Sequence, residues 1–265
     1  EYDIIHCHFG PIGLFGAFLK EIGIKSRLVT TFHGYDMSSF IVSNGNNVYK
    51  NLFLNGDLFL PISDYWKRKL VRLGCDEKKI VVHRMGINLE KFEFSERGKQ
   101  TGEPIKILTI GRLVEKKGHR YAIEAVSKIV KKHKNIEYII AGDGPLRQGL
   151  ESLVRKLEIE KYVKFLGVVN QDELLKLYQY VHIFILPSMT ARNGDQEGIP
   201  VVLMEAQATG LPVISTFHSG IPEGVLDGKS GFLVPEKDVD ALADRLEYLI
   251  EHPENSLKIS MIYKN

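Results

Sequence analysis

Two glutamates, Glu197 and Glu205, stand eight positions apart in a stretch that also contains Gly198 and Pro200. Pro200 suits the first turn of a helix, because its fixed φ angle fits there and its missing N–H would have no acceptor in any case. Gly210 suits the position just after the last turn. The pattern therefore places Glu197 in the loop before a short helix and Glu205 about one and a half turns inside it.

The start of this short helix could bind an anion such as a diphosphate. The first N–H groups of a helix have no intrahelical acceptor, and the helix dipole adds partial positive charge. A carboxylate beside such a site can accept hydrogen bonds from the hydroxyls of a sugar. Two glutamates alone are more simply explained as a loop charge and a partly buried helix carboxylate, so the other motifs decide between these interpretations.

A second candidate site is the loop from Gly111 to Gly118, where Arg112 and Lys117 stand five positions apart. A guanidinium can hold phosphate oxygens through two parallel hydrogen bonds, and an ammonium adds a point charge. An ordinary basic loop would have the same composition. Further along the chain, Gly142 begins a tight turn, which turn chemistry alone could explain.

Three other segments lie in expected strands or at their ends. Leu166, Gly167 and Val168 could lie along a flat base through their backbone groups, although alone they are only a strand end. His33 ends a strand of the first half, and Asp36 stands three residues on, where it could orient the imidazole. His6 and His8 are two residues apart in a strand, so their side chains point to the same side. No carboxylate cluster accompanies them, so we expect no metal site there.

These segments are positioned by an alternation of apolar strands and amphipathic helices. We expect strands at residues 2–9, 27–32, 57–62, 79–83, 105–110, 136–141, 163–166, 182–186, 213–216 and 232–234. We expect helices at 12–22, 64–73, 118–133, 146–157, 171–180, 200–209 and 239–251. Continuous apolar runs such as 183–186 fit strands buried on both faces of a parallel sheet. The alternation predicts doubly wound α/β domains, with ligands outside the carboxyl ends of the strands.

The domain organisation follows from length and composition. The 265 residues suit two modest domains. The polar segment 95–104 is the predicted linker between a first domain at 1–94 and a second domain at 105–265. The first domain offers fewer strands than a doubly wound half usually needs, so we expect it to be truncated and a further segment to precede Glu1 in the natural protein.

The composition excludes several classes of protein. Lys and Arg number 35 against 33 Asp and Glu, and this net charge of +2 does not indicate a nucleic-acid partner. The two cysteines fit a reducing cytoplasm, and no apolar run is long enough for a membrane span. The aromatic and basic helix at 65–72 could lie on the inner face of a membrane, although a solvated helix with buried faces is the simpler interpretation.

Taken together, the motifs resemble the retaining glycosyltransferases of family 4, whose GT-B fold has two Rossmann-like domains facing a cleft. The resemblance runs from about residue 2 to about residue 251. It rests on Gly111-Arg112 with Lys117-Gly118, on Gly142-Asp143-Gly144-Pro145, on the Glu-x7-Glu pattern of Glu197 and Glu205, and on His33-Gly34-x-Asp36. The segments 31–36 and 194–200 look most similar to bacterial exopolysaccharide enzymes of the colanic-acid type.

The resemblance implies roles for these residues. Arg112 and Lys117 would bind the donor diphosphate, Glu205 the ribose hydroxyls and Glu197 the donor sugar, with His33 near that sugar. The implied catalytic set is His33, Arg112, Lys117 and Glu197. The implied donor-binding set adds Gly111, Gly142, Leu166, Gly167, Val168, Gly198, Ile199, Pro200, Val201 and Glu205.

The expected activity is transfer of a sugar, with anomeric retention, from a nucleotide diphosphate sugar such as a UDP-sugar to a hydroxyl of a growing or lipid-linked glycan. No cofactor and no metal is expected, because the fixed cations and the helix start would supply the positive charge. The alternatives are a sugar-nucleotide epimerase, a non-catalytic nucleotide-binding fragment and, less favoured, a dinucleotide oxidoreductase, for which the sequence lacks the G-x-G-x-x-G motif. Oligomeric state is not predicted.

Overall fold

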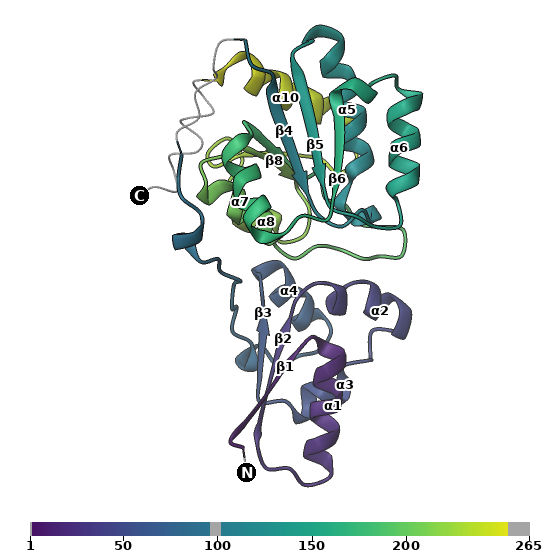
Figure 1. Cartoon of the computed structure of the whole chain (residues 1–265). Coiled ribbons are helices and arrows are strands. Elements are labelled where there is room, and N and C mark those ends of the chain that lie inside the picture. Colours follow the sequence, from purple (N-terminus) through teal and green to yellow (C-terminus); the bar gives the residue numbers. More distant parts are fainter. Residues whose placement is uncertain (1, 96–101, 254–265) are drawn as a thin grey trace. The chain divides into compact units, whose positions relative to one another are not determined.

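The computed structural model describes residues 2–95 and 102–253 and is labelled in Figure 1. The chain forms two compact units, the first made of residues 1–86 with 190–199 and the second of residues 87–189 with 200–265. The division after Gly86 precedes the predicted end of the first domain at residue 94. Most of the predicted linker, residues 96–101, lies outside the described residues, so the linker stays a prediction.

The first unit contains a parallel sheet in the order β1-β2-β3. Its strands are β1 (Ile4–His8), β2 (Arg27–Phe32) and β3 (Leu58–Pro61). Its helices are α1 (Gly10–Glu21), α2 (Ser39–Asn44), α3 (Lys50–Asn55) and α4 (Asp64–Arg72), with 3-10 turns at Tyr35–Met37 and Glu77–Lys79. The hydroxyl of Ser63, a residue type favoured at this position, accepts the N–H of Trp66 and caps α4.

The strand predicted at 79–83 is wrong, because only Ile80 forms a bridge, to Phe59. The N–H of Val81 donates to Phe59 and that of His83 to Pro61, so the segment runs beside β3. A second parallel bridge would need Pro61 to donate an N–H in return, and proline has none. The missing N–H of Pro61 therefore limits the pairing of this segment with β3 to a single bridge.

β1 lies at one edge of this sheet, and the outer face of α1 exposes Ile12, Phe15 and Phe18. α4 turns Trp66 and Leu70 into the core, so the indole is not at the surface. Among the described residues, no helix combines the length and apolarity that a membrane span requires. The segment expected upstream of Glu1 stays a prediction.

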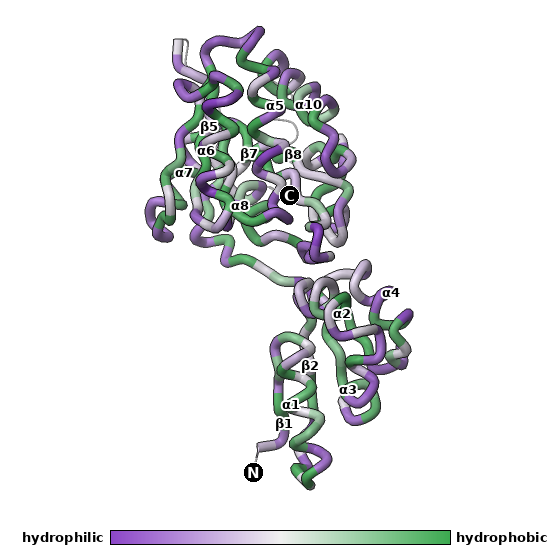
Figure 2. The backbone as a smooth tube through the Cα atoms, turned by 90° about the vertical axis from the view of Figure 1, so that its right-hand side faces the viewer, coloured by the Kyte–Doolittle hydropathy of each residue, from purple (hydrophilic) through white to green (hydrophobic). Residues whose placement is uncertain are grey.

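The second unit is a six-stranded parallel sheet in the order β6-β5-β4-β7-β8-β9. Its strands are β4 (Ile105–Ile110), β5 (Ile136–Ala141), β6 (Val163–Gly167), β7 (Ile183–Ile185), β8 (Val213–Thr216) and β9 (Phe232–Val234). The chain winds outward from β4 in both directions, as expected for a doubly wound sheet. Strands such as β7 are fully buried and appear in hydrophobic colours in Figure 2.

Helices cover both faces of this sheet (Figure 1). One core forms beneath α5 (His119–Lys132), α6 (Arg147–Lys156) and α10 (Val239–Glu251). The other forms beneath α7 (Gln171–Tyr180), α8 (Val201–Ala208) and α9 (Ile221–Gly224). Asn170 and Glu173 form a capping box that starts α7. Shorter 3-10 turns lie at Leu89–Lys91, Glu115–Lys117 and Glu160–Tyr162.

Candidate functional site

Three glycines stand side by side where neighbouring strands of the second unit end. Gly111 follows β4, Gly142 follows β5 and Gly167 closes β6. The N–H of Gly111 donates to Ala141 over 3.0 Å, and the N–H of Gly142 donates to Gly167 over 2.7 Å. These bonds continue the sheet past its last regular residues, so the three loops leave its carboxyl edge as one backbone surface.

Side chains are excluded from this backbone surface. Gly142 has a φ angle of 139°, in the region that other residues rarely adopt. A Cβ at that position would lie 2.0 Å from the carbonyl oxygen of Gly111. The close approach of the β4 and β5 loops therefore requires glycine, and a phosphate or a ribose can approach the bare backbone closely.

The loop after β4 carries the two predicted cations. The stem of Lys117 lies along Gly111, with its Cε 3.3 Å from where a Cβ of that glycine would be. The Arg112 side chain is exposed, while its carbonyl oxygen accepts the N–H of Val114 over 2.8 Å. The loop backbone is thus fixed and one cation of the pair reaches toward solvent.

A buried histidine forms a hydrogen bond with the backbone of this loop. His119 Nε2 lies 3.0 Å from the carbonyl oxygen of Arg112, so the ring donates its N–H there. Burial lowers the pKa of His119 to about 4, and the hydrogen bond to Arg112 opposes that shift. The imidazole is therefore neutral at pH 7, and it positions the loop without adding charge.

α8 holds the second glutamate. Pro200 precedes α8 as its N-cap residue, one position earlier than predicted, and offers no side-chain acceptor to the first N–H groups. Gly210 has a φ of 83° after the last turn, which confirms the predicted cap. Glu205 is half-buried, and its Oε2 accepts the hydroxyl of Tyr178 over 2.8 Å. Burial raises the pKa of Glu205, and this hydrogen bond opposes the rise.

The first glutamate belongs to the first unit, because residues 190–199 are part of it. Glu197 is 8% exposed. A Cβ on Gly198 would lie 2.7 Å from the carbonyl oxygen of His33, and one on Gly34 would lie 3.2 Å from the Gly198 nitrogen. The structure therefore brings the Glu197 loop and the His33 loop into backbone contact within this unit.

Asp36 fixes the His33 loop, but through the backbone and not through the ring as predicted. Its carboxylate accepts the N–H groups of His33 (3.0 Å), Gly34 (2.8 Å) and Gly10 (2.9 Å). The ring instead places its Nε2 3.0 Å from Nδ1 of His8. Burial is the main cause that lowers the pKa of His33, so the imidazole favours its neutral form.

The residues predicted to face a base lie at the end of β6. Leu166 is 46% exposed and Val168 81% exposed. Both line a groove with Leu177 and Tyr180 of α7. Exposed apolar side chains can contact a flat ring, so the position of this segment is compatible with its predicted role.

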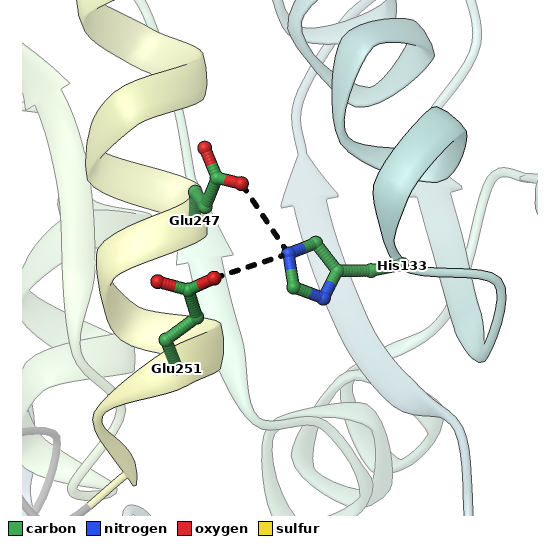
Figure 3. A group of neighbouring side chains, drawn as sticks. All are labelled: His133, Glu247 and Glu251. Carbon is green, nitrogen blue, oxygen red and sulfur yellow. Dashed lines mark ion pairs between the residues drawn. The ribbon is translucent and has the colours of Figure 1, made fainter.

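The one group of His, Cys, Asp or Glu side chains among the described residues that could hold a metal ion contains none of the predicted site residues. His6 Nε2 lies 2.8 Å from the Thr31 hydroxyl. One group of the described residues, His133 with Glu247 and Glu251, has ligand atoms within reach of a single ion. Figure 3 shows the ring of His133 directed at both carboxylates of α10, 3.5 and 3.7 Å away.

This group is better explained as an ion-pair cluster. Lys132 Nζ already lies 2.8 Å from Glu247 Oε1 and supplies a positive charge there. The side chains join the C-terminal end of α5 to α10. The sequence analysis did not predict this cluster.

The structure thus divides the predicted residues between the two units. The strand ends of the second unit bring together Gly111, Arg112, Lys117, Gly142 and the segment 166–168. α8 of the same unit carries Val201 and Glu205, whereas His33, Glu197, Gly198 and Ile199 belong to the first unit. The sequence analysis missed Tyr178 and His119 and weighed His8 only as a metal ligand, because each acts through a contact that only the fold creates.

Comparison with known proteins agrees with this arrangement. Residues 90–264 match the family model of Glycosyl transferases group 1, and residues 1–91 match that of Glycosyltransferase Family 4. A Salmonella typhimurium protein named a colanic acid biosynthesis glycosyltransferase is 43% identical over 246 residues, which are 92% of this chain and 60% of that protein. An amylovoran biosynthesis glycosyltransferase of Erwinia amylovora is 43% identical over 243 residues, 91% of this chain and 60% of its own. The chain therefore spans 60% of the length of these relatives.

Among solved structures, the crystal structure of Anabaena Alr3699/HepE in complex with UDP and glucose aligns with 98% of this chain and 71% of its own, with a TM-score of 0.84 and 21% identity. At this identity the likeness concerns the fold. It confirms the predicted α/β architecture of two Rossmann-like domains of the GT-B type.

Proposed function

Because the chain belongs to the family 4, group 1 glycosyltransferases, we propose that it transfers a sugar from a nucleotide diphosphate sugar to a hydroxyl of a growing glycan. The relatives named for colanic acid and amylovoran biosynthesis support an exopolysaccharide as the product class. We propose anomeric retention and a UDP-sugar donor. The donor proposal is supported by the UDP in the crystal structure of the Anabaena protein.

The observation that carries this proposal is the glycine surface of Gly111, Gly142 and Gly167 beside the Arg112 and Lys117 loop. Bare backbone lets a diphosphate approach closely, and the two cations can neutralise its charge. The first N–H groups of α8, which Pro200 leaves uncapped, can add donors.

The chemistry proposed for this site is electrostatic. As the bond between the anomeric carbon and the diphosphate breaks, negative charge grows on the departing phosphate oxygen. Donors and cations held in place before the reaction stabilise that charge without reorganising. We propose that Glu197 and His33 contact the donor sugar, Glu205 the ribose hydroxyls and the segment 166–168 the base. A metal ion is not required in this scheme.

The cellular setting is also a proposal. Cys7 and Cys75 are both buried free thiols, which fits a reducing cytoplasm. A glycan acceptor carried on a lipid would bring the protein to the inner face of the membrane without a spanning helix.

Calorimetric titration of the chain with UDP, GDP and ADP tests the proposal. We expect UDP to bind most tightly and excess EDTA to leave its affinity unchanged. Tighter binding of GDP or ADP would show that the donor carries another base, while the proposed nucleotide site would stand. Binding of none of the three would refute the nucleotide-sugar function.

A further inference from the structure

Among the residues that the structure describes, Tyr178 is the one whose side chain donates a hydrogen bond to the carboxylate of Glu205. Its ring is fully buried between Phe92 and Phe184, whose centroids lie 6.0 and 6.1 Å away. This packing restricts the ring, and the fold therefore determines where its hydroxyl lies. That hydroxyl is 2.8 Å from Glu205 Oε2.

The single hydroxyl proton of Tyr178 goes to the carboxylate. A second acceptor, the carbonyl oxygen of Val202, lies 3.3 Å away, clearly farther than the Glu205 oxygen. A phenol has one proton to donate, and hydrogen bonds to ionised acceptors are the shorter and stronger ones. The core alone would be satisfied by the carbonyl, so the carboxylate is not needed to complete the packing of Tyr178.

One oxygen of Glu205 remains available. Within residues 2–95 and 102–253, Tyr178 is the only hydrogen-bond partner of this carboxylate, and it occupies Oε2. Oε1 is therefore left to accept a hydrogen bond from outside the protein. A glutamate on a helix normally samples several rotamers, which it must give up when it binds a ligand. The bond from Tyr178 removes that freedom in advance.

We propose that Tyr178 is a positioning residue that holds the Glu205 carboxylate so that its Oε1 accepts a ribose hydroxyl of the donor nucleotide. This inference rests on the proposed function, because it assumes that Glu205 faces the ribose. It adds a residue from α7 to a site that the sequence motifs confine to α8 and the strand-end loops.

The same contact also affects the pKa of Glu205. Burial raises the pKa of Glu205 and the Tyr178 hydrogen bond lowers it, and no other titratable group among the described residues shifts it clearly. Burial also raises the pKa of Tyr178, so its hydroxyl keeps its proton throughout the accessible pH range. Removing the hydroxyl would leave burial unopposed, and the carboxylate would be protonated at a higher pH.

The test is calorimetric titration of the full chain and its Tyr178→Phe variant with UDP, 3′-deoxy-UDP, 2′-deoxy-UDP and pyrophosphate between pH 5 and 8. We expect about 10-fold weaker UDP binding by the variant, since a hydrogen bond to a charged group is lost. Pyrophosphate binding should be unchanged. At least one deoxy nucleotide should lose much less affinity than UDP. The fall in UDP affinity at low pH should begin at a higher pH in the variant.

Two further variants complete the design. Tyr248→Phe removes a hydroxyl from α10, which covers the other face of the sheet, and should leave UDP affinity unchanged. Glu205→Gln keeps an acceptor for Tyr178 but cannot titrate, so the part of the low-pH fall in UDP affinity that Glu205 causes should disappear, while the part caused by protonation of the terminal phosphate of UDP remains. This variant keeps the inference testable should Tyr178→Phe not fold.

Equal losses for UDP and both deoxy nucleotides, or for UDP and pyrophosphate, would show that Tyr178 has only a packing role and would overturn the inference alone. A low-pH fall in UDP affinity that is as large in Glu205→Gln as in the unchanged chain would do the same. Failure of the unchanged chain to bind any nucleotide would instead overturn the proposed function, and this inference with it.

Discussion

Replacing Gly142 by alanine should disrupt the glycine surface at its centre. The residue has a φ of 139°, and its Cβ would lie 2.0 Å from the carbonyl oxygen of Gly111. That oxygen cannot retreat freely, because the N–H of Gly111 is bonded to Ala141 on β5. The loops after β4 and β5 must therefore separate, or Gly142 must change its conformation.

The free-energy cost of Gly142→Ala has two parts. Holding a residue with a side chain in a sparsely populated backbone region costs about 1–3 kcal/mol. Overpacking a tightly packed contact costs about 1–3 kcal/mol more. We expect Gly142→Ala to lower the free energy of unfolding by about 3 kcal/mol and to weaken UDP binding about 10-fold or more, because the diphosphate loops move apart.

Gly149→Ala is the matched control. Gly149 lies inside α6, where a Cβ would meet no atom within 4 Å. Alanine there should stabilise the helix by about 0.5–1 kcal/mol. Urea unfolding and calorimetry with UDP measure both variants. A Gly142→Ala protein as stable as the wild type, with unchanged UDP affinity, would refute the close approach of the two loops.

Four other predictions follow from the site. Arg112→Ala and Lys117→Ala should each weaken UDP binding about 10–100-fold in calorimetry, since each removes a charged hydrogen bond, while Lys131→Ala on the outside of α5 should not. Glu197→Ala should weaken a UDP-sugar more than UDP, and equal losses would exclude a contact with the sugar. EDTA should leave UDP affinity unchanged, and loss with rescue by Mg²⁺ or Mn²⁺ would require a metal. The His119 pKa falls from 6.5 to about 4 on folding, so stability should be complete above pH 6.5 and decline by about 3 kcal/mol toward pH 4. His119→Gln keeps a donor for the Arg112 carbonyl and should flatten this decline in urea unfolding, whereas an unchanged slope would assign it to other groups.

The sequence predicted the second unit closely, because its strands are rich in apolar residues and several contain continuous apolar runs. Residues 105–110, 136–141, 213–216 and 232–234 form strands with the expected bounds. The first unit was harder. α2 and α3 have six residues each and too few turns for a helical period to show. The effect of Pro61 on the segment 79–83 appears only once its pairing partner is known.

The residues of the candidate site likewise include some that the sequence reveals and some that it does not. Strand-end glycines and cations are visible as local motifs, so Gly111, Arg112, Lys117 and Gly142 could be placed in advance. Tyr178 stands 27 positions from Glu205 and His8 stands 25 from His33. Contacts at such separations come from the packing of the fold, and no local spacing encodes them. The grouping of residues 190–199 with the first unit is likewise a tertiary feature.

The central claim is that the carboxyl edge of the second unit binds a nucleotide diphosphate. Backbone amide NMR of the labelled chain, titrated with UDP, tests it directly. The claim predicts that the largest shift changes occur at Gly111, Gly142, Gly167 and Val201, and that they saturate with one affinity. Shift changes confined to the first unit, or to the ends of α5 and α10 around His133, would contradict it.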